Sequence, residues 1–215
     1  MSPVRGRFVT FEGGEGAGKS TQIRLLATWL AERGVEARMT REPGGTPGAE
    51  RIRSLLVEGE AGDWTPMTEA LLNYAARREH VSRVIAPALA AGQWVLSDRF
   101  ADSTMAYQGF GHGLGRKAIE ALHRAAIGRL APDLTIVLDI PVREGLARAA
   151  ARRGREDRYE NMAVEFHERV RRGFRAIARG EPRRCALLDA RLPPEALQEE
   201  IRRVVARRLA RALGR

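Results

Sequence analysis

A chain of 215 residues that is 44% hydrophobic and 30% charged is long enough for one globular domain with a proper core. No apolar run approaches the roughly 20 residues that span a bilayer, and the start of the chain leads directly into a strand. We therefore expect no signal peptide, no membrane partner and a cytoplasmic location. The single cysteine, Cys185, excludes an internal disulfide and a cysteine-based zinc site, and its apolar strand predicts that it is buried and inert.

The net charge of +10 has three interpretations. It could mark a nucleic-acid-binding surface, solvated arginine-rich helix faces such as 202–215, or arginines that bind small anionic substrates. The sequence contains no helix-turn-helix, RNA-binding or zinc-finger pattern, and only 6% of its residues are aromatic. We therefore expect no nucleic-acid partner.

The first strong pattern is a glycine-rich segment that fits the P-loop spacing G-x-x-x-x-G-K-[ST]. A β-prone run, 8–11, precedes it, and apolar residues at helical spacing follow it. Backbone N–H groups in such a strand–loop–helix unit can surround a phosphate. The predicted nucleoside triphosphate-binding residues are Gly13, Gly14, Glu15, Gly16, Ala17, Gly18, Lys19, Ser20 and Thr21.

Lysine usage supports this interpretation. The chain has 37 lysines and arginines, but lysine occurs only at Lys19 and Lys117. A compact, flexible point charge suits triphosphate oxygens better than a planar guanidinium does. The alternative is a glycine-rich turn with an incidental lysine.

The rest of the chain alternates between strand and helix patterns. We expect strands at 35–40, 94–97, 134–138 and 185–188, and helices near 49–57, 66–91, 103–108, 116–129, 142–153, 163–179 and 194–213. Proline and glycine make 41–48 a shaped loop, and Gly109, Gly111, Gly113 and Gly115 predict a flexible loop. This alternation predicts an α/β fold with an open, five-stranded parallel sheet covered on both faces.

Ligands of open parallel sheets bind beyond the carboxyl ends of the strands. The loops at those ends begin at Gly13, Arg41, Asp98, Asp139 and Asp189, and we expect one crevice to collect them. The GTPase strings D-x-x-G and N-K-x-D are absent. A short P-loop chain with a late arginine-rich segment suggests a small-molecule kinase with a closing lid.

Residues 96–108, Leu-Ser-Asp-Arg-Phe-Ala-Asp-Ser-Thr-Met-Ala-Tyr-Gln, resemble the signature of the thymidylate kinase family. The segments 11–21, 41–46 (Arg-Glu-Pro-Gly-Gly-Thr) and 157–160 (Asp-Arg-Tyr-Glu) are similar to its P-loop, second loop and lid end. The resemblance covers nearly the whole chain. It implies a P-loop NTPase fold of the nucleoside monophosphate kinase type, with a single domain over 1–215 and a lid at about 148–161.

The resemblance also implies the activity: ATP and Mg²⁺ phosphorylate dTMP to dTDP, a step in dTTP biosynthesis, in a cytoplasmic homodimer. Two alternatives remain open. One is a kinase for another nucleoside monophosphate, against which 96–108 argues, and the other is a basic nucleic-acid-binding P-loop protein.

Site roles follow from the family pattern residue by residue. Lys19 and the loop backbone would hold the ATP phosphates, while Ser20 and Asp98 would face the metal. Arg99 would bind the dTMP phosphate, with a structural ion pair to Asp98 as its alternative. The resemblance places Arg53, Glu42 and Pro43 around that phosphate.

For the sugar and base, the resemblance implies that Glu15 and Glu160 serve the 3′-hydroxyl and the metal's water shell; for Glu15 the alternative is a solvated loop carboxylate. Tyr107 would pack against the sugar. The base would contact Arg77, Thr104 and Gln108. The family's stacking aromatic residue is replaced by Asn73, and the adjacent Tyr74 points about 100° away on a regular helix.

The P-loop interior, 14–17, contains no arginine. The resemblance is to a subtype in which the lid supplies the transition-state charge. Arg153 and Arg155 are our catalytic candidates, although some lid arginines belong to a solvated face. The lid arginines are Arg148, Arg152, Arg153, Arg155 and Arg158. The turn at Ala190 resembles the loop beside adenine.

Overall fold

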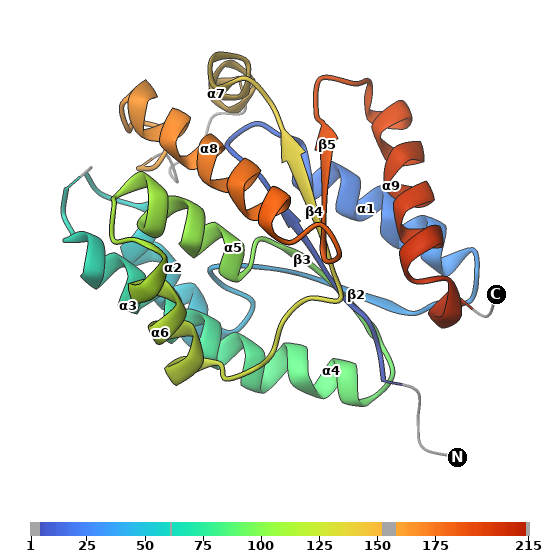
Figure 1. Ribbon diagram of the computed structural model, residues 1–215. Coiled ribbons are helices and arrows are strands. Elements are labelled where there is room, and N and C mark those ends of the chain that lie inside the picture. Colours follow the sequence, from blue (N-terminus) through green and yellow to red (C-terminus); the bar gives the residue numbers. More distant parts are fainter. Residues whose placement is uncertain (1–4, 61, 152–157, 214–215) are drawn as a thin grey trace.

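The computed structural model describes residues 5–60, 62–151 and 158–213. Within them, five strands form one parallel sheet in the order β2-β3-β1-β4-β5, which confirms the expected α/β architecture (Figure 1). The strands are β1 (Phe8–Glu12), β2 (Ala37–Arg41), β3 (Trp94–Asp98), β4 (Leu134–Asp139) and β5 (Cys185–Asp189).

Helices cover both faces of this sheet, as parallel strands require. The helices are α1 (Lys19–Ala31), α2 (Pro47–Val57), α3 (Pro66–His80), η1 (Val81–Ile85), α4 (Ala86–Ala90), α5 (Ala101–Thr104), η2 (Met105–Gly111), α6 (Arg116–Ala126), α7 (Val142–Ala150), α8 (Val164–Gly180), α9 (Pro194–Arg208) and η3 (Ala210–Leu213). None of the helices in the described ranges combines the length and apolar composition that a membrane crossing requires.

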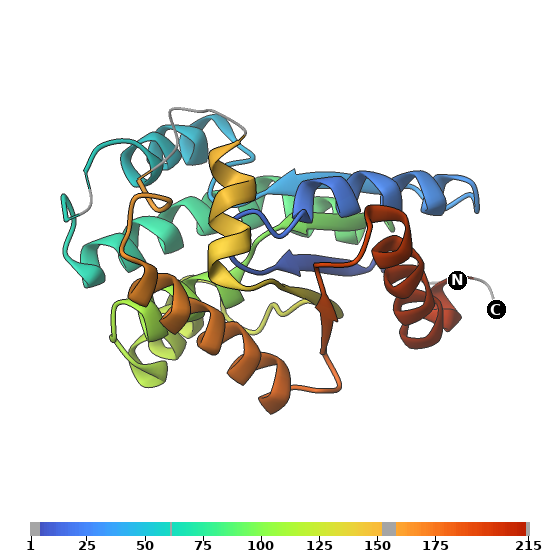
Figure 2. The same ribbon diagram turned by 90° about the horizontal axis from the view of Figure 1, so that it is seen from above.

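Alternation along β1 divides the core into two layers. Val9 and Phe11 pack in the cluster that α1 and α9 share, and these two helices lie side by side (Figure 1). Phe8 points to the opposite layer, which α3, η2 and α8 build. Thr10 and Glu12, which are also buried, point to that same layer by the period of two. Figure 2 shows α7 as a separate helix between the P-loop side and α8.

Two helical segments contain π-helical turns. The expected helix 66–91 is divided into α3, the π-helical η1 and α4. The loop expectation at 109–115 is wrong for Gly109 and Gly111, because both lie in the π-helical η2. A Cβ on Gly111 would lie 2.7 Å from the ring of Phe166 on α8. The glycine therefore lets η2 pack directly against α8.

Arg77 and His80 on α3 are buried, and both side chains contact the buried carboxylate of Glu42. Cys185 is buried as expected, and burial raises the pKa of its thiol to about 12. A thiol with this pKa is unreactive near neutral pH.

Candidate active site

The P-loop connects β1 to α1 through three glycines with positive φ. Gly13, Gly16 and Gly18 have φ values of 136°, 67° and 85°, and Gly18 is the left-handed N-cap of α1. A Cβ on Gly16 would lie 2.0 Å from the carbonyl oxygen of Gly145, and one on Gly145 would lie 2.4 Å from the carbonyl oxygen of Glu15. The P-loop is thus in backbone contact with α7, which ends at Ala150 inside the segment 148–161 expected to form a lid.

Lys19 lies over the loop that precedes it. Its Nζ donates to the carbonyl oxygens of Gly13 (3.2 Å) and Gly14 (3.1 Å), and burial together with the nearby Arg99 lowers its pKa. Ser20 donates its hydroxyl to the Oδ2 of Asp98 at 2.6 Å. Because β1 and β3 are paired neighbours, the first helical turn and the end of β3 meet at this point.

Arg99, directly after β3, takes a left-handed backbone conformation with a φ of 71°. Its guanidinium donates to the Gly13 carbonyl (3.0 Å), Ser103 Oγ (3.1 Å), Glu15 Oε1 (3.0 Å) and the Tyr107 hydroxyl (3.1 Å). The ion-pair partner of Arg99 is therefore Glu15. The alternative considered from the sequence, an ion pair between Arg99 and Asp98, is wrong.

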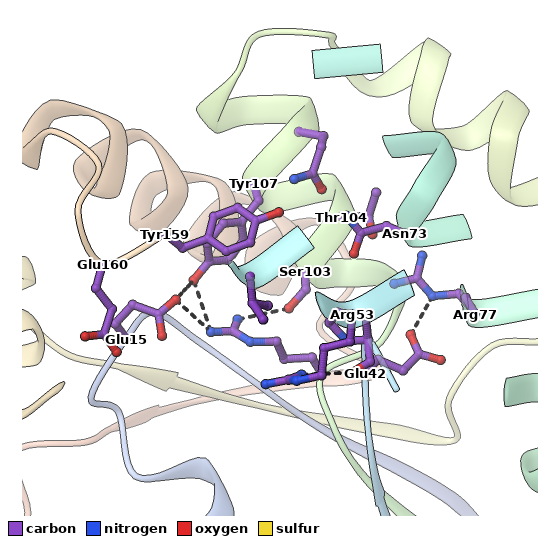
Figure 3. Close-up of a pocket in the computed structure, with 14 residues that line it drawn as sticks. Glu15, Glu42, Arg53, Asn73, Arg77, Ser103, Thr104, Tyr107, Tyr159 and Glu160 are labelled. Carbon is purple, nitrogen blue, oxygen red and sulfur yellow. Dashed lines mark hydrogen bonds and ion pairs between the residues drawn. The ribbon is translucent and has the colours of Figure 1, made fainter. Parts of the chain in front are cut away.

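Glu15 is held and is not a solvated loop residue. The Tyr107 hydroxyl donates to its carboxylate at 2.6 Å, alongside Arg99 (Figure 3). Burial alone would raise the pKa of Glu15, but the charges of Arg99 and Lys19 and the Tyr107 hydroxyl lower it to about 2. The carboxylate is ionised at any physiological pH.

Two adjoining pockets lie on this edge of the sheet. The P-loop pocket is lined by Glu15, Gly16, Ala17, Gly18, Lys19, Ser20, Arg41, Glu42, Arg53, Asp98, Arg99 and Glu160. The acceptor pocket is lined by Glu15, Glu42, Pro43, Arg53, Val57, Asn73, Arg77, Arg99, Ser103, Thr104, Tyr107, Gln108, Tyr159 and Glu160 (Figure 3). Glu15, Glu42, Arg53, Arg99 and Glu160 line both. The structure thus collects most predicted site residues in one two-part crevice.

Not every strand end contributes to these two pockets. Asp139 forms a two-pronged ion pair with Arg171 on α8, at 2.8 and 2.9 Å, and Asp189 pairs with Arg191. A further pocket, lined by Gly13, Gly14 and Glu15 together with Asp139, brings the end of β4 to the P-loop. Four of the five expected strand ends therefore meet at this edge, and Asp189 of β5 lines none of these pockets.

Two residues that line the acceptor pocket, Arg77 and Thr104, each have a buried polar atom without a hydrogen-bond partner among the described residues. Arg77 donates from Nε to the Glu42 carboxylate (2.7 Å) and from Nη2 to the Phe100 carbonyl (3.0 Å). Its buried Nη1 has no hydrogen-bond partner among the described residues. The same is true of the Thr104 hydroxyl oxygen. Buried polar atoms are normally paired, so two unpaired ones that line a pocket indicate a ligand with polar edges.

Asn73 lines this pocket, and its neighbour Tyr74 does not replace the missing aromatic residue. The Tyr74 ring packs 4.8 Å from the Arg77 guanidinium in the core, and its hydroxyl donates to the Ile119 carbonyl. The pocket's aromatic side chains are Tyr107 and Tyr159, which pack edge to face with centroids 5.4 Å apart.

Two of the five arginines expected in the lid, Arg148 and Arg158, lie in the described part of the chain and bind other segments of the protein. Arg148 donates to the Ala190 carbonyl at 2.9 Å, which places Ala190 beside α7. Arg158 is buried, and its guanidinium donates to the Leu56 and Glu60 carbonyls and to Glu69. Arg158 therefore attaches its own chain segment, at the end of the expected lid, to the C-terminal end of α2, to Glu60 and to α3. Arg152, Arg153 and Arg155 lie outside the described residues.

The sequence interpretation missed three residues here. Ser103 accepts from Arg99 and donates to Glu12 at 2.6 Å, and Glu12 also accepts the Phe100 N–H at 2.8 Å. Burial and the nearby Asp102 raise the pKa of Glu12 to about 8. Tyr159 is the third. Ser103 lies inside the segment 96–108 that resembles the family signature, and this was the available signal.

A P-loop that shares its lining with a second polar pocket defines a phosphotransferase of the P-loop class, which holds a nucleoside triphosphate next to a second substrate. Comparison with known proteins narrows the class. The thymidylate kinase family model matches residues 11–201. The thymidylate kinase of Caulobacter vibrioides is 54% identical over 206 residues, covering 96% of this chain and 99% of that protein.

Other proteins similar to this chain are also thymidylate kinases. The thymidylate kinase of Afipia carboxidovorans is 52% identical over 98% of this chain and 93% of its own. The crystal structure of the Ehrlichia chaffeensis thymidylate kinase superposes with a TM-score of 0.76 at 36% identity, covering 94% of this chain and 98% of that chain. The chain belongs to the thymidylate kinase family, which confirms the resemblance seen in the sequence.

Proposed function

We propose that this enzyme transfers the terminal phosphate of ATP to dTMP, giving dTDP and ADP for dTTP biosynthesis. The observation that supports it most is the pair of adjoining pockets, in which Arg99 and Glu15 line both sides. Phosphoryl transfer asks a protein mainly to position two phosphates and to neutralise developing charge. Two pockets that share a charged wall suit this task.

On the ATP side, Lys19 and the backbone of Gly13 to Ser20 bind the phosphates, and the turn at Ala190 lies near adenine. Ser20 and Asp98 hold Mg²⁺; their 2.6 Å contact supports this, because it joins a hydroxyl and a carboxylate beside the P-loop. Mg²⁺ commonly takes one or two protein oxygens and completes its shell with phosphates and water. When bound, it neutralises charge on the phosphates. The described residues contain no cluster of three metal-binding side chains, which is compatible with such a site.

On the acceptor side, Arg99 and Arg53 bind the dTMP phosphate, while Glu42 and Pro43 form the adjacent wall. Arg99 lines both pockets, and its guanidinium is held there by four acceptors; a phosphate would take its Nε–H or replace one of these acceptors. Glu15 and Glu160 serve the sugar hydroxyl, and Tyr107 packs against the sugar.

For the base, Arg77 and Thr104 offer their unpaired buried atoms to the carbonyl edge of thymine, and Gln108 completes the edge. Asn73 provides a polar wall where the family carries an aromatic one.

During transfer, lid arginines stabilise the developing charge, in a lid of about 148–161 that belongs to the one domain. Arg148 and Arg158 have structural partners, and of the remaining Arg152, Arg153 and Arg155 we favour Arg153 and Arg155 as the catalytic residues. An arginine that reaches the transferred phosphate is worth about 10³-fold or more in rate.

We further propose that the enzyme works in the cytoplasm as a homodimer. Three apolar side chains on the adjacent helices α2 and α3 are unusually exposed: Leu55 (47%), Met67 (40%) and Leu71 (51%). A second copy of the chain would cover them. Sedimentation equilibrium tests this assembly.

An acceptor panel tests the activity: ATP and Mg²⁺ with dTMP, dUMP, dCMP, dGMP or AMP, with Lys19→Ala as the control. We expect dTMP to have the highest kcat/KM and the control to lose turnover. The proposal is wrong if another acceptor is preferred. Salt-sensitive DNA binding as the only activity would favour a nucleic-acid-binding protein.

A further inference from the structure

A buried carboxylate, Glu69, lies in the first turn of α3 behind the acceptor pocket. Three side chains from other segments donate to it: Gln108 Nε2 at 2.5 Å, Arg158 Nη2 at 2.7 Å and His112 Nε2 at 3.3 Å. Glu69 does not line the pocket itself. Gln108 does, so Glu69 contacts the pocket wall from behind.

Glu69 is ionised in this position. Burial alone would raise its pKa, but the hydrogen bonds from His112, Arg158 and Gln108 outweigh burial and lower the pKa below its ordinary value. An ionised carboxylate has only acceptors to offer. The amide of Gln108 must therefore turn its NH₂ group toward Glu69. This determines the orientation of the amide, whose oxygen and nitrogen ends have nearly the same size and shape.

The other end of that amide faces the pocket. Gln108 lines the acceptor pocket, and none of the described residues donates a hydrogen bond to its Oε1. On the same pocket, Arg77 offers the unpaired donor Nη1. The far end of the pocket therefore combines a fixed donor with a fixed acceptor.

We infer that Glu69 is a positioning residue for base specificity, which it controls by holding the Gln108 oxygen toward the pocket. This inference rests on the proposed function. A fixed acceptor beside a fixed donor matches a base edge on which an N–H group adjoins a carbonyl, as in thymine and uracil. Cytosine carries an acceptor at that N–H position and an amino group in place of the carbonyl. Both contacts then become mismatched, and a site that leaves buried polar groups unpaired rejects its ligand strongly.

Arg158 extends the inference to the lid. It donates to Glu69 and to carbonyls at the end of α2, and Tyr159 and Glu160, the next two residues, line the acceptor pocket. One buried ion pair therefore fixes both the orientation of Gln108 and the chain that closes the pocket after the lid.

The test is Glu69→Gln, with kcat/KM measured for dTMP, dUMP and dCMP. A glutamine at 69 can donate to the Gln108 oxygen, so the Gln108 amide can turn over and present its NH₂ group to cytosine. We expect the ratio of kcat/KM for dTMP to that for dCMP to fall at least about tenfold, while the dTMP to dUMP ratio changes little, since both bases share the recognised edge. A purely structural Glu69 would lower all three values together, and an unchanged dTMP to dCMP ratio would overturn the inference.

Two further variants complete the test. Glu79→Gln makes the same chemical change at a partly exposed position of α3, where Glu79 pairs with Arg83, and should leave the ratios unchanged. If Glu69→Gln does not fold, Gln108→Leu, which removes the proposed acceptor, must lower the dTMP to dCMP ratio by itself; an unchanged ratio there refutes the inference. Within Gln108→Leu, adding Glu69→Gln should have no further effect on the ratio. Loss of dTMP preference in the unmodified enzyme would instead refute the proposed function.

Discussion

Glu12 and Glu15 are three residues apart, yet their environments shift their acidity in opposite directions. Glu15 lies among Arg99, Lys19 and the Tyr107 hydroxyl, and its pKa falls to about 2. Glu12 points into the layer of α5 and η2, where burial and Asp102 raise its pKa to about 8. A carboxylate at a strand end ordinarily predicts solvation, so this difference in pKa was not predictable from the residue types alone.

Glu12 leads to a prediction on pH and stability. Between its ordinary pKa of 4.5 and about 8, the folded state keeps the proton that the unfolded state has lost. The free energy of unfolding therefore falls as pH rises through this window, by at most about 1.4 kcal/mol per pH unit. Glu12→Gln removes this contribution. Urea unfolding from pH 5 to 8 should show a shallower decline in the variant.

All other titrating groups are common to both proteins, so the difference between the two slopes isolates Glu12. Equal slopes would contradict the raised pKa. Glu15 has the opposite sign: its stabilisation is present above pH 4.5 and is lost as pH falls toward 2, outside the window of this experiment.

Arg158 gives a second prediction at the residue scale. Arg158→Ala leaves the Glu69 carboxylate buried without its guanidinium partner, and losing one member of a buried pair costs about 3–5 kcal/mol. Urea unfolding measures the loss. Arg83→Ala, which breaks the exposed pair with Glu79, should leave the free energy of unfolding nearly unchanged. Similar losses in the two variants would mean that Arg158 is not a buried attachment.

At the scale of elements, four strands were predictable because each is a short apolar run that ends at Glu or Asp, whereas β2 has a mixed sequence and lies next to a proline- and glycine-rich loop. The π-helical segments were not. Their wider turns depend on what packs against them: η2 contacts Phe166 and Val170 of α8 at Gly111. A glycine that is needed for close packing and a glycine in a flexible loop look the same in a sequence.

The contact at Gly111 can be tested. Gly111→Ala places a Cβ 2.7 Å from the Phe166 ring and 2.9 Å from Val170, and such overpacking costs about 1–3 kcal/mol. Gly180→Ala, at the end of α8, has no atom within 4 Å of the new Cβ and should be neutral or stabilising. Thermal unfolding of both variants checks the pair. A neutral Gly111→Ala would show that η2 and α8 separate easily.

For the whole molecule, the alternation of patterns predicted a parallel sheet but not the order of its strands. The observed order places β1 between β3 and β4, so the P-loop lies between the ends of those strands, near Asp98. The motifs predicted most residues of the two pockets. Glu12, Glu69 and Ser103 were missed because their roles depend on burial and on contacts between distant segments.

The two-pocket arrangement predicts how ligands stabilise the fold. ATP or dTMP at about 100 times its Kd should each add about 2.7 kcal/mol to the free energy of unfolding. For a domain of this size that corresponds to a rise in Tm of roughly 5–10 °C. Thermal unfolding with each ligand, using an unreactive ATP analogue for the pair, checks this. Because the ligands occupy different pockets, the two shifts should add; competition between them would contradict separate pockets.

The contact between Gly16 and Gly145 links the evolution of two distant segments. A Cβ on either glycine would overlap the backbone of the other segment, so neither position can gain a side chain unless the other segment moves. A chimera that receives α7 from a relative must therefore keep a glycine at 145 or exchange the P-loop as well. Substitutions in the P-loop and in α7 are coupled at this contact.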